Sequence, residues 1–343
     1  MPELRQNPIS KQWVIIATER AKRPHELVVH RGEEKPIPSY VENCPFCPGN
    51  EHMTPSESLR VARDGQWQIR VVPNKFAALA SQGERIRQSD GLKRIISGVG
   101  IHEVLVETPD HSRTTALLPV DQVALILQAY KDRYFSITQD PRIEHVTIFK
   151  NHGLGAGTSL EHPHSQIIAT PIIPPEIRNR MEEALRFFDD NSECLFCRVL
   201  AEELRDGVRI VHETARFVAF MPFASLTPFS LWIYPRRHMA SFGEIHPEEI
   251  QDMALMLRTV LAKVYYGLGN PDFNYVLRTS PAENRHSRFY HWYLTLIPRL
   301  TRVAGFELGS GMYINSTLPE ANAEFLRNVE LPAAFGQSLP PAG

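Results

Sequence analysis

All four cysteines of this 343-residue chain fall in two C-x-x-C pairs, and two histidines accompany each pair further along the chain. The two sets are Cys44, Cys47, His111 and His162, and Cys194, Cys197, His238 and His291. Two thiolates and two imidazoles are the ligands of a closed tetrahedral zinc site. Because these ligands lie too far apart in sequence for a zinc finger, we predict that each zinc ion binds ligands from a C-x-x-C turn and from a sheet.

The chemistry of the cysteine pairs depends on the compartment. In a reducing compartment, C-x-x-C pairs are metal or redox sites rather than structural disulfides. A thioredoxin-type motif has one pair at the start of a helix, whereas the sequences around Cys44 and Cys194 are both turn-like. We therefore expect two structural Zn²⁺ ions that contribute to stability and not to the reaction. The alternative is that His111 and His238 are ordinary strand-end histidines, and the repetition of the whole set argues against it.

The segments between these ligands also repeat. Each half has an apolar strand, an amphipathic helix and a second strand, predicted at 104–110, 119–130 and 146–149, and at 229–235, 247–257 and 274–277. Further helices are predicted at 174–188 and 316–327. Period-2 strands that alternate with long helices indicate an α+β fold with a mostly antiparallel sheet and flanking helices.

A second imidazole distinguishes the two halves. The motif His-Pro-His-Ser-Gln begins at His162 and follows a Gly-rich loop, 151–159, whose backbone N–H groups can approach phosphate oxygens closely. When the halves are aligned on His162 and His291, Tyr293 stands opposite His164. We therefore predict a catalytic N-terminal domain, a C-terminal domain with a degenerate site and a flexible tail, at 1–173, 174–330 and 331–343.

The residue types in this motif predict phosphoryl chemistry. His164 can attack the α-phosphorus of a nucleotide and form a phosphoramidate, if a backbone carbonyl holds its other ring nitrogen. Gln166 can donate an amide N–H to a phosphoryl oxygen, and because it has no useful pKa it does not activate water. Ser159 and the loop N–H groups, Gly157 among them, are expected to hold the β-phosphate side. The alternative is a surface turn with two solvated histidines.

Composition sets the remaining limits. Hydrophobic residues make up 43% and charged residues 22% of the chain, which is ordinary for a globular protein. A net charge of −2 and a pI near 6.7 give no field that would recruit nucleic acid or an anionic membrane. The sequence shows neither a signal-peptide core nor an apolar run long enough to span a membrane, so we expect a cytoplasmic protein.

Several motifs occur in the order found in the galactose-1-phosphate uridylyltransferase family, a branch of the histidine-triad superfamily. They lie at 5–24, 44–50, 72–79, 109–112 and 162–166. The chain resembles that family over nearly its whole length. The resemblance implies two tandem histidine-triad-like half-domains and a ping-pong transfer through a nucleotidyl-histidine, in which His164 matches the nucleophile and Gln166 its partner.

The same resemblance assigns the substrate contacts. Asn74, Asn151 and Ser159 match positions that contact the nucleotide and its phosphates. Arg20 and Arg23 match arginines that reach the phosphates from the partner subunit, which implies a homodimer. From charge alone, these two arginines would instead belong to a solvated basic stretch.

The sequence also departs from the family's pattern. Arg180 stands where the bacterial uridylyltransferases place a glutamate ligand of a second metal site. The C-terminal Cys/His set resembles relatives with two zinc sites, such as the plant ADP-glucose phosphorylases. The segment 305–315 lacks the lysine, tyrosine and glutamate of the uridylyltransferases and is closer to the phosphorylase pattern.

These observations predict a UDP-glucose–hexose-1-phosphate (galactose-1-phosphate) uridylyltransferase, which exchanges UMP between a nucleotide-sugar and a sugar 1-phosphate. An ADP-glucose phosphorylase or another adenylyl-transferring relative is the close alternative. A nucleotide hydrolase is disfavoured because Gln166 stands where hydrolases keep a third histidine. A non-catalytic zinc module is disfavoured because it would not need His164 or the Gly-rich loop.

Overall fold

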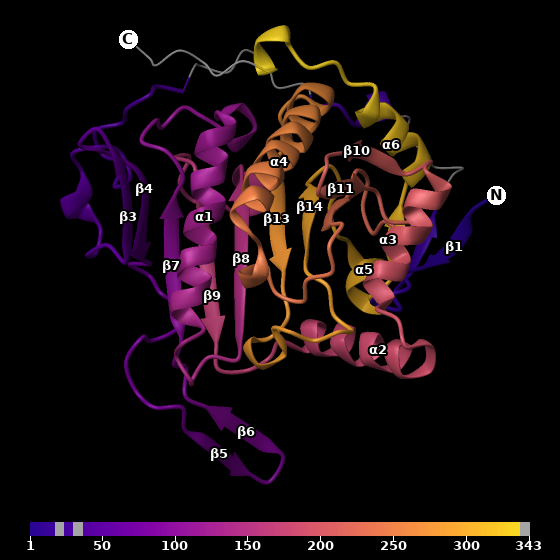
Figure 1. Ribbon diagram of the computed structural model, residues 1–343, viewed down its shortest axis with the longest axis horizontal. Helices are drawn as coiled ribbons and strands as arrows, with labels where there is room; N and C mark the ends of the chain where they lie inside the picture. The colour runs from indigo at the N-terminus through magenta and orange to yellow at the C-terminus, as the bar shows by residue number, and fades with distance from the viewer. Residues whose placement is uncertain (18–23, 30–36, 337–343) are drawn as a thin grey trace.

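The computed structural model describes residues 1–17, 24–29 and 37–336. Ten strands of these residues form one sheet, in which every neighbouring pair is antiparallel (Figure 1). In sheet order they are β10 (Ile210–Glu213), β11 (Phe217–Phe220), β12 (Leu231–Pro235), β14 (Tyr293–Pro298), β13 (Phe273–Arg278), β8 (His145–His152), β9 (His164–Thr170), β7 (Ile101–Val106), β4 (Gln66–Pro73) and β3 (Leu59–Arg63). The predicted α+β class with a mostly antiparallel sheet is confirmed.

The sequence repeat is visible in the strand order. The first half contributes β7, β9 and β8, and the second half contributes β12, β14 and β13 in the mirrored order. The two triplets join where β8 pairs with β13, with Phe273 opposite His152 and Leu277 opposite Ile148. The halves therefore share a continuous sheet. The strand predicted at 104–110 ends at Val106, because the chain turns away from the sheet before it reaches His111.

One face of the sheet is covered by two long helices that lie side by side, α1 (Val120–Ile137) and α4 (Pro247–Leu268) (Figure 1). Both are longer than predicted, because the apolar periodicity continues through residues such as Tyr134 and Val264, which are buried in the core. α4 ends at Gly269, which has φ +71°, and a Cβ there would collide with the Val29 carbonyl.

The opposite face is covered differently in the two halves. Over the second half lie α2 (Pro175–Asn191) and α3 (Leu195–Asp206), which bury Tyr234 and Tyr293. Over the first half lies the chain around the first C-x-x-C pair, with Phe46 packed near Val104 and Val106. Strand alternation places Ile167 on the α1 side, and His164 and Gln166 on this second face.

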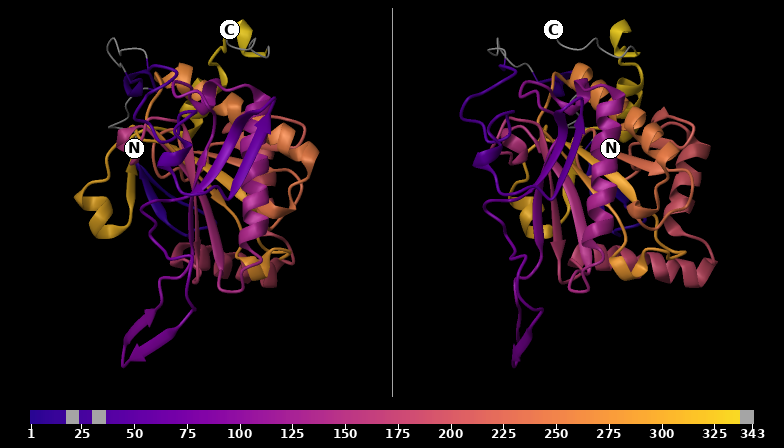
Figure 2. Two further views of the ribbon diagram at one scale, coloured as in Figure 1. Left: turned by 90° about the vertical axis from the view of Figure 1, so that its left-hand side faces the viewer. Right: turned by 60° about the vertical axis from the view of Figure 1, so that its left-hand side comes forward.

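The remaining elements tie the ends of the chain together. β1 (Glu3–Gln6) pairs with β2 (Trp13–Ile16), and β2 pairs in parallel with β15 (Tyr313–Asn315). α5 (Gly305–Ser310) precedes β15, and α6 (Pro319–Arg327) follows it. The hairpin of β5 (Arg87–Asp90) and β6 (Lys93–Ile96) projects from the body in every view (Figures 1 and 2). Within the described ranges, the structure has no helix with the length and hydrophobicity of a membrane span.

Candidate active site and metal sites

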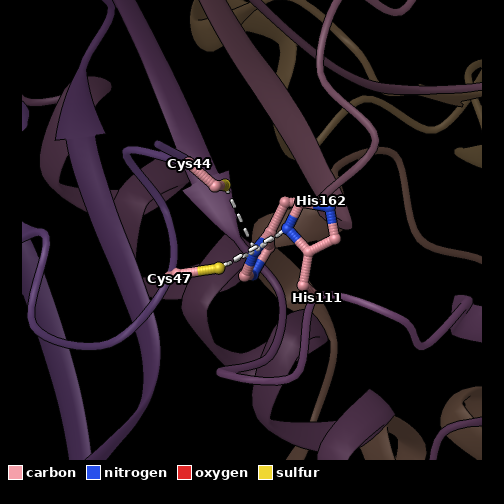
Figure 3. A group of neighbouring side chains, drawn as sticks. All are labelled: Cys44, Cys47, His111 and His162. Carbon is pink, nitrogen blue, oxygen red and sulfur yellow. Dashed lines mark hydrogen bonds between the residues drawn. The ribbon is translucent and has the colours of Figure 1, made fainter. Parts of the chain in front are cut away.

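The four predicted ligands of the first set converge, although they come from separate parts of the chain (Figure 3). Cys44, Cys47, His111 and His162 are all buried, and their ligand atoms lie within 4.8 Å of one another. The Cys47 sulfur is 3.5 Å from His111 Nδ1 and 3.7 Å from His162 Nδ1.

The surroundings of this group fit a cation. His162 Nε2 donates to the Thr108 carbonyl at 2.8 Å, which leaves Nδ1 unprotonated and directed toward the sulfurs. Such an outer hydrogen bond is the usual way to orient a metal-bound imidazole. Burial raises the pKa of Cys47 to about 11, so a thiolate at this position requires a positive charge beside it. The group can therefore hold a metal ion.

In the second half, Cys194, Cys197 and His238 form an equivalent group. The Cys197 sulfur is 3.3 Å from His238 Nδ1 and 3.3 Å from His291 Nδ1. The prediction that this C-x-x-C pair lies in a turn is wrong. Cys194 is the N-cap of α3, so Cys197 lies in the first helical turn, because the apolar residues 195, 196, 199 and 200 continue with helical spacing.

His164 is the first residue of β9 and is 7% exposed. Its Nδ1 donates to the His162 carbonyl at 2.8 Å, because a carbonyl can only accept, and the proton is thereby fixed on Nδ1. Burial lowers the pKa of His164, and the nearby Lys150 ammonium contributes in the same direction. Nε2 of a neutral ring is thus the free lone pair. The backbone carbonyl that the sequence argument required is the one at His162.

Two cavities meet at His164. The larger, of about 620 Å³, is lined by Asn151, Ser159 and the Gly-rich loop. The smaller, of about 340 Å³, is lined by Asn74 and Gln166. His164 and Ser159 line both.

Besides the residues around these two cavities, three substrate contacts were predicted, at Gly157, Arg20 and Arg23, and the structure describes only Gly157 of them. Gly157 lines neither, and its N–H donates to the Leu154 carbonyl at 3.0 Å. Its role in the loop is conformational, since it has φ +89°. Arg20 and Arg23 lie outside the described residues.

Comparisons with known proteins show the family of this chain. Residues 1–174 match the family described as "Galactose-1-phosphate uridyl transferase, N-terminal domain". The chain belongs to the galactose-1-phosphate uridylyltransferase family. It is similar to an ADP-glucose phosphorylase of Arabidopsis thaliana, with 35% identity over 96% of this chain and 93% of that one. It is also similar to a galactose-1-phosphate uridylyltransferase of Thermotoga maritima, with 30% identity over 96% of this chain and 99% of that one.

Solved structures give the same result. The crystal structure of an ADP-glucose phosphorylase from Arabidopsis thaliana with bound ADP-glucose superimposes with a TM-score of 0.82, at 32% identity, over 96% of this chain and all of that one. A uridylyltransferase structure gives a TM-score of 0.74 at 26% identity, over 95% and 97%. The chain is therefore a nucleotidyltransferase of the galactose-1-phosphate uridylyltransferase family, as its motifs predicted.

In this family member, His102 on β7 is a site residue that sequence reasoning missed. Its Nδ1 accepts the Ala78 N–H at 3.1 Å, so its proton lies on Nε2. Nε2 lies 2.8 Å from Gln166 Oε1 and therefore donates to it. The carboxamide of Gln166 is thus held with its NH₂ group directed away from His102. The sequence signal that could have found His102 is the alternation of side chains along β7. It places residues 102 and 104 on the face of the sheet that carries Gln166.

A buried ion pair beneath His164 was also missed. Lys150 Nζ donates to the His164 carbonyl at 3.0 Å and to Glu107 at 2.8 Å. Both side chains are almost fully buried, and Glu107 also accepts from the Thr115 hydroxyl at 2.7 Å. Through the bond from Lys150 to the His164 carbonyl, the ion pair holds the backbone at the start of β9, so the position of His164 depends on it.

Proposed function

We propose that this chain transfers a nucleoside monophosphate from a nucleotide-sugar to a sugar 1-phosphate through a nucleotidyl-His164 intermediate. The observation that carries the proposal is the state of His164. The ring is neutral, its Nδ1 proton is held by the His162 carbonyl, and Nε2 is left free where two cavities meet. Only an unprotonated nitrogen can attack phosphorus.

Each half-reaction is one displacement at the α-phosphorus. In the first, the Nε2 lone pair forms a P–N bond and the P–O bond to the β-phosphate breaks, so the sugar 1-phosphate leaves with that electron pair. In the second, an oxygen of the acceptor's phosphate attacks the same phosphorus and the P–N bond electrons return to Nε2. The Nδ1 proton stays in place throughout, because the charge that develops on the ring is stabilised by the His162 carbonyl.

The surrounding residues supply position and charge. Gln166, oriented by His102, directs its NH₂ group to a non-bridging oxygen of the transferred phosphoryl group. Ser159 stands between the cavities and holds the β-phosphate side. Asn74 lies with Phe46 and Phe76 in the smaller cavity, whose aromatic rings suit a nucleoside, and Asn151 lies in the larger one.

We assign Zn²⁺ to both Cys/His groups and a structural role to each ion. The first ion would also position the nucleophile, because it holds His162, whose carbonyl accepts the His164 proton. We also propose that the protein is a cytoplasmic homodimer, in which Arg20 and Arg23 reach the phosphates bound by the partner subunit. The transfer needs no helix N-terminus to bind phosphate and no open coordination position on either ion.

UDP-glucose and a hexose 1-phosphate are the proposed substrates. A second candidate is an adenylyl transfer from ADP-glucose to phosphate. It is favoured by the 35% identity to the Arabidopsis ADP-glucose phosphorylase, against 30% to the Thermotoga uridylyltransferase, and by the Cys/His group of the second half.

The test follows the α-phosphate. The zinc-loaded protein is incubated with UDP-glucose or ADP-glucose labelled there, and galactose 1-phosphate, glucose 1-phosphate, inorganic phosphate or water serves as the acceptor. We expect acid-labile label on the protein, which His164→Ala abolishes and His286→Ala, a change at an exposed histidine remote from the cavities, leaves intact. Release of free nucleoside monophosphate as the main product would overturn the proposal in favour of hydrolysis.

A further inference from the structure

The second half contains a buried group of polar residues at the position that corresponds to His164. Tyr293 on β14 lies opposite Arg278 on β13. On its other side Tyr234 of β12 stacks against it, with the ring centroids 4.8 Å apart. Arg180 of α2 and Tyr290 of the preceding loop lie against the same three strands, near enough to interact electrostatically with Tyr293.

These residues carry more hydrogen-bond donors than acceptors. Five of their buried polar atoms have no hydrogen-bond partner within the described ranges, and they are Arg180 Nη1, Arg278 Nε and the hydroxyls of Tyr234, Tyr290 and Tyr293. A tyrosine hydroxyl carries a proton that it can donate, and each arginine nitrogen is a donor only. A buried donor without an acceptor is costly, so a group this dense indicates a missing acceptor.

The charge of the group points the same way. Glu176 accepts from Arg180 at 2.7 Å and lies 3.6 Å from Arg278, so one carboxylate serves two guanidinium groups. Arg180 is 7% exposed, and buried charges require pairing. One positive charge therefore remains without a counterion at this place.

There is space for the missing acceptor. A cavity of about 130 Å³ is lined by Glu176, Arg180, Arg278, Tyr293 and Thr295, and by the exposed Arg299, so three guanidinium groups face one carboxylate. It shares no lining residue with the two cavities around His164. At roughly 30 Å³ per water, this volume corresponds to about four water molecules, which is enough for a tetrahedral oxyanion.

We propose that the second half binds one phosphate-class oxyanion between Arg180, Arg278 and Tyr293. The ligand is inorganic phosphate or the phosphate group of a small ester. Arginine presents planar pairs of N–H donors that match phosphate oxygens, and the Tyr293 hydroxyl adds a further donor. Water alone would satisfy the donors but would leave the positive charge uncompensated. The inference does not depend on the nucleotidyl transfer proposed for His164.

Crystals of the zinc-loaded full-length protein soaked in tungstate locate the ion directly. The expected result is an anomalous peak within hydrogen-bond distance of Arg180 and Tyr293. Soaks in glucose 1-phosphate distinguish an ester from the free ion, because a sugar bound there extends toward Arg299. A map with water in this cavity and no anomalous peak overturns the proposal.

Solution binding uses inorganic phosphate at constant ionic strength, with chloride as the balancing salt. We expect phosphate to raise the Tm. In Arg180→Gln, the phosphate concentration that gives half of this increase should be at least about tenfold higher, as the loss of a charged hydrogen bond predicts. Arg186→Gln is the matched control, because Arg186 lies on the same helix and is exposed. If Arg180→Gln does not fold, Tyr293→Phe decides, since it removes only a hydroxyl. An unchanged phosphate response in Tyr293→Phe and Arg180→Gln contradicts the site.

Discussion

The two halves of this molecule share a Cys/His framework that could hold a metal ion, and they differ in the residues beside it. Each brings a C-x-x-C pair and two histidines together at the same face of the sheet. In the first half the next strand position is His164, whose ring faces two cavities. In the second half the position is Tyr293, which is fully buried beneath α2 and α3. The same Cys/His framework is thus found beside two different sites. They differ in the residue two positions after the last histidine of each set, which is His164 in the first half and Tyr293 in the second.

The interior beneath the two positions differs as well. Lys150 and Glu107 form a buried ion pair below His164, whereas the corresponding positions of the second half are the apolar Leu277 and Pro235. A charged pair is a costly way to fill a core, so its presence under the catalytic strand alone indicates a function there. That function is to hold the backbone of β9 at His164.

The largest effect is expected at the nucleophile. His164→Ala should lower turnover by about 10⁴-fold or more, because the covalent route is lost. Tyr293→His, the reverse change in the second half, should create no second labelled site, since the cavity there, of about 130 Å³, is too small for a nucleotide-sugar. Labelling stoichiometry with an α-³²P donor checks both. Two labelled sites per chain in Tyr293→His would contradict the comparison.

Removal of a metal ligand separates the halves in a second way. Cys47→Ser and Cys197→Ser should each remove one zinc ion and lower the Tm by roughly 10 °C, because metal binding contributes to folding free energy. Only Cys47→Ser should also lower kcat, by about 10–100-fold, since its ion holds the residue that orients His164. Zinc analysis, thermal unfolding and kcat on the same samples check this. Equal losses of kcat in both variants would remove the distinction between the two ions.

The buried ion pair gives the next effect in size. Lys150→Met leaves Glu107 charged and unpaired, so we expect a loss of about 3–5 kcal/mol in the free energy of unfolding. Leu277→Met, the same substitution at the corresponding position, should cost less than about 1.5 kcal/mol, because it nearly conserves volume. Denaturant unfolding measures both. The double variant Lys150→Met/Glu107→Gln should recover part of the loss, and a failure to do so would show that the charge is not its cause.

Much of this comparison could be predicted from sequence, because its parts are local. The C-x-x-C pairs, the His-Pro-His-x-Gln motif and the repeated strand–helix–strand order all lie within short stretches of chain. The four predicted strands lie within a few residues of β7, β8, β12 and β13, and the other strands were not predicted. The lengths of α1, α2 and α4 were underestimated, whereas α6 begins three residues later than predicted. The helix that begins after Cys194 was taken for a turn, because a metal-ligand motif was given more weight than the apolar periodicity after it.

The parts that could not be predicted depend on neighbours distant in sequence. His102 acts on Gln166 from the adjacent strand, and only the register of β7 with β9 brings them together. Arg180 was compared only with the glutamate of a lost metal site. In the fold it pairs with Glu176 on its own helix and interacts with tyrosines of β12, of β14 and of the loop before β14. The Gly157 N–H donates to the Leu154 carbonyl inside the loop, a contact that the loop sequence did not predict, and its contact with substrate stays a prediction.

The pH dependence of transfer gives a finer test of the first half. The folded pKa of His164 lies below 6.5 because burial disfavours the charged ring. The reactive neutral ring therefore predominates at pH 6.5 and above, and it is lost as the pH falls through the lower, folded value. We expect the rate at which the nucleotide-sugar labels the protein to vary little from pH 8 to 6.5 and to fall about tenfold per pH unit below the folded pKa. A midpoint at or above 6.5 in this half-reaction, whose diphosphate donor does not titrate in the range, would contradict the assigned state.

The smallest effect is expected at His102, which contacts Gln166 at 2.8 Å and also the Asn74 amide at 3.0 Å. His102→Ala frees the carboxamide to rotate, so we expect kcat to fall about tenfold, the equivalent of one hydrogen bond of ~1.4 kcal/mol, with little change in KM. His102→Gln keeps a donor near Gln166 Oε1 and should recover most of the rate, whereas a packing role would not be rescued in this way. The matched control is Ser230→Ala. Ser230 directly precedes β12 and corresponds to His102 in the second half, so its loss should leave kcat unchanged. A tenfold loss that persists in the Gln166→Ala background would show that His102 acts independently of the amide, because two residues on one path should not add.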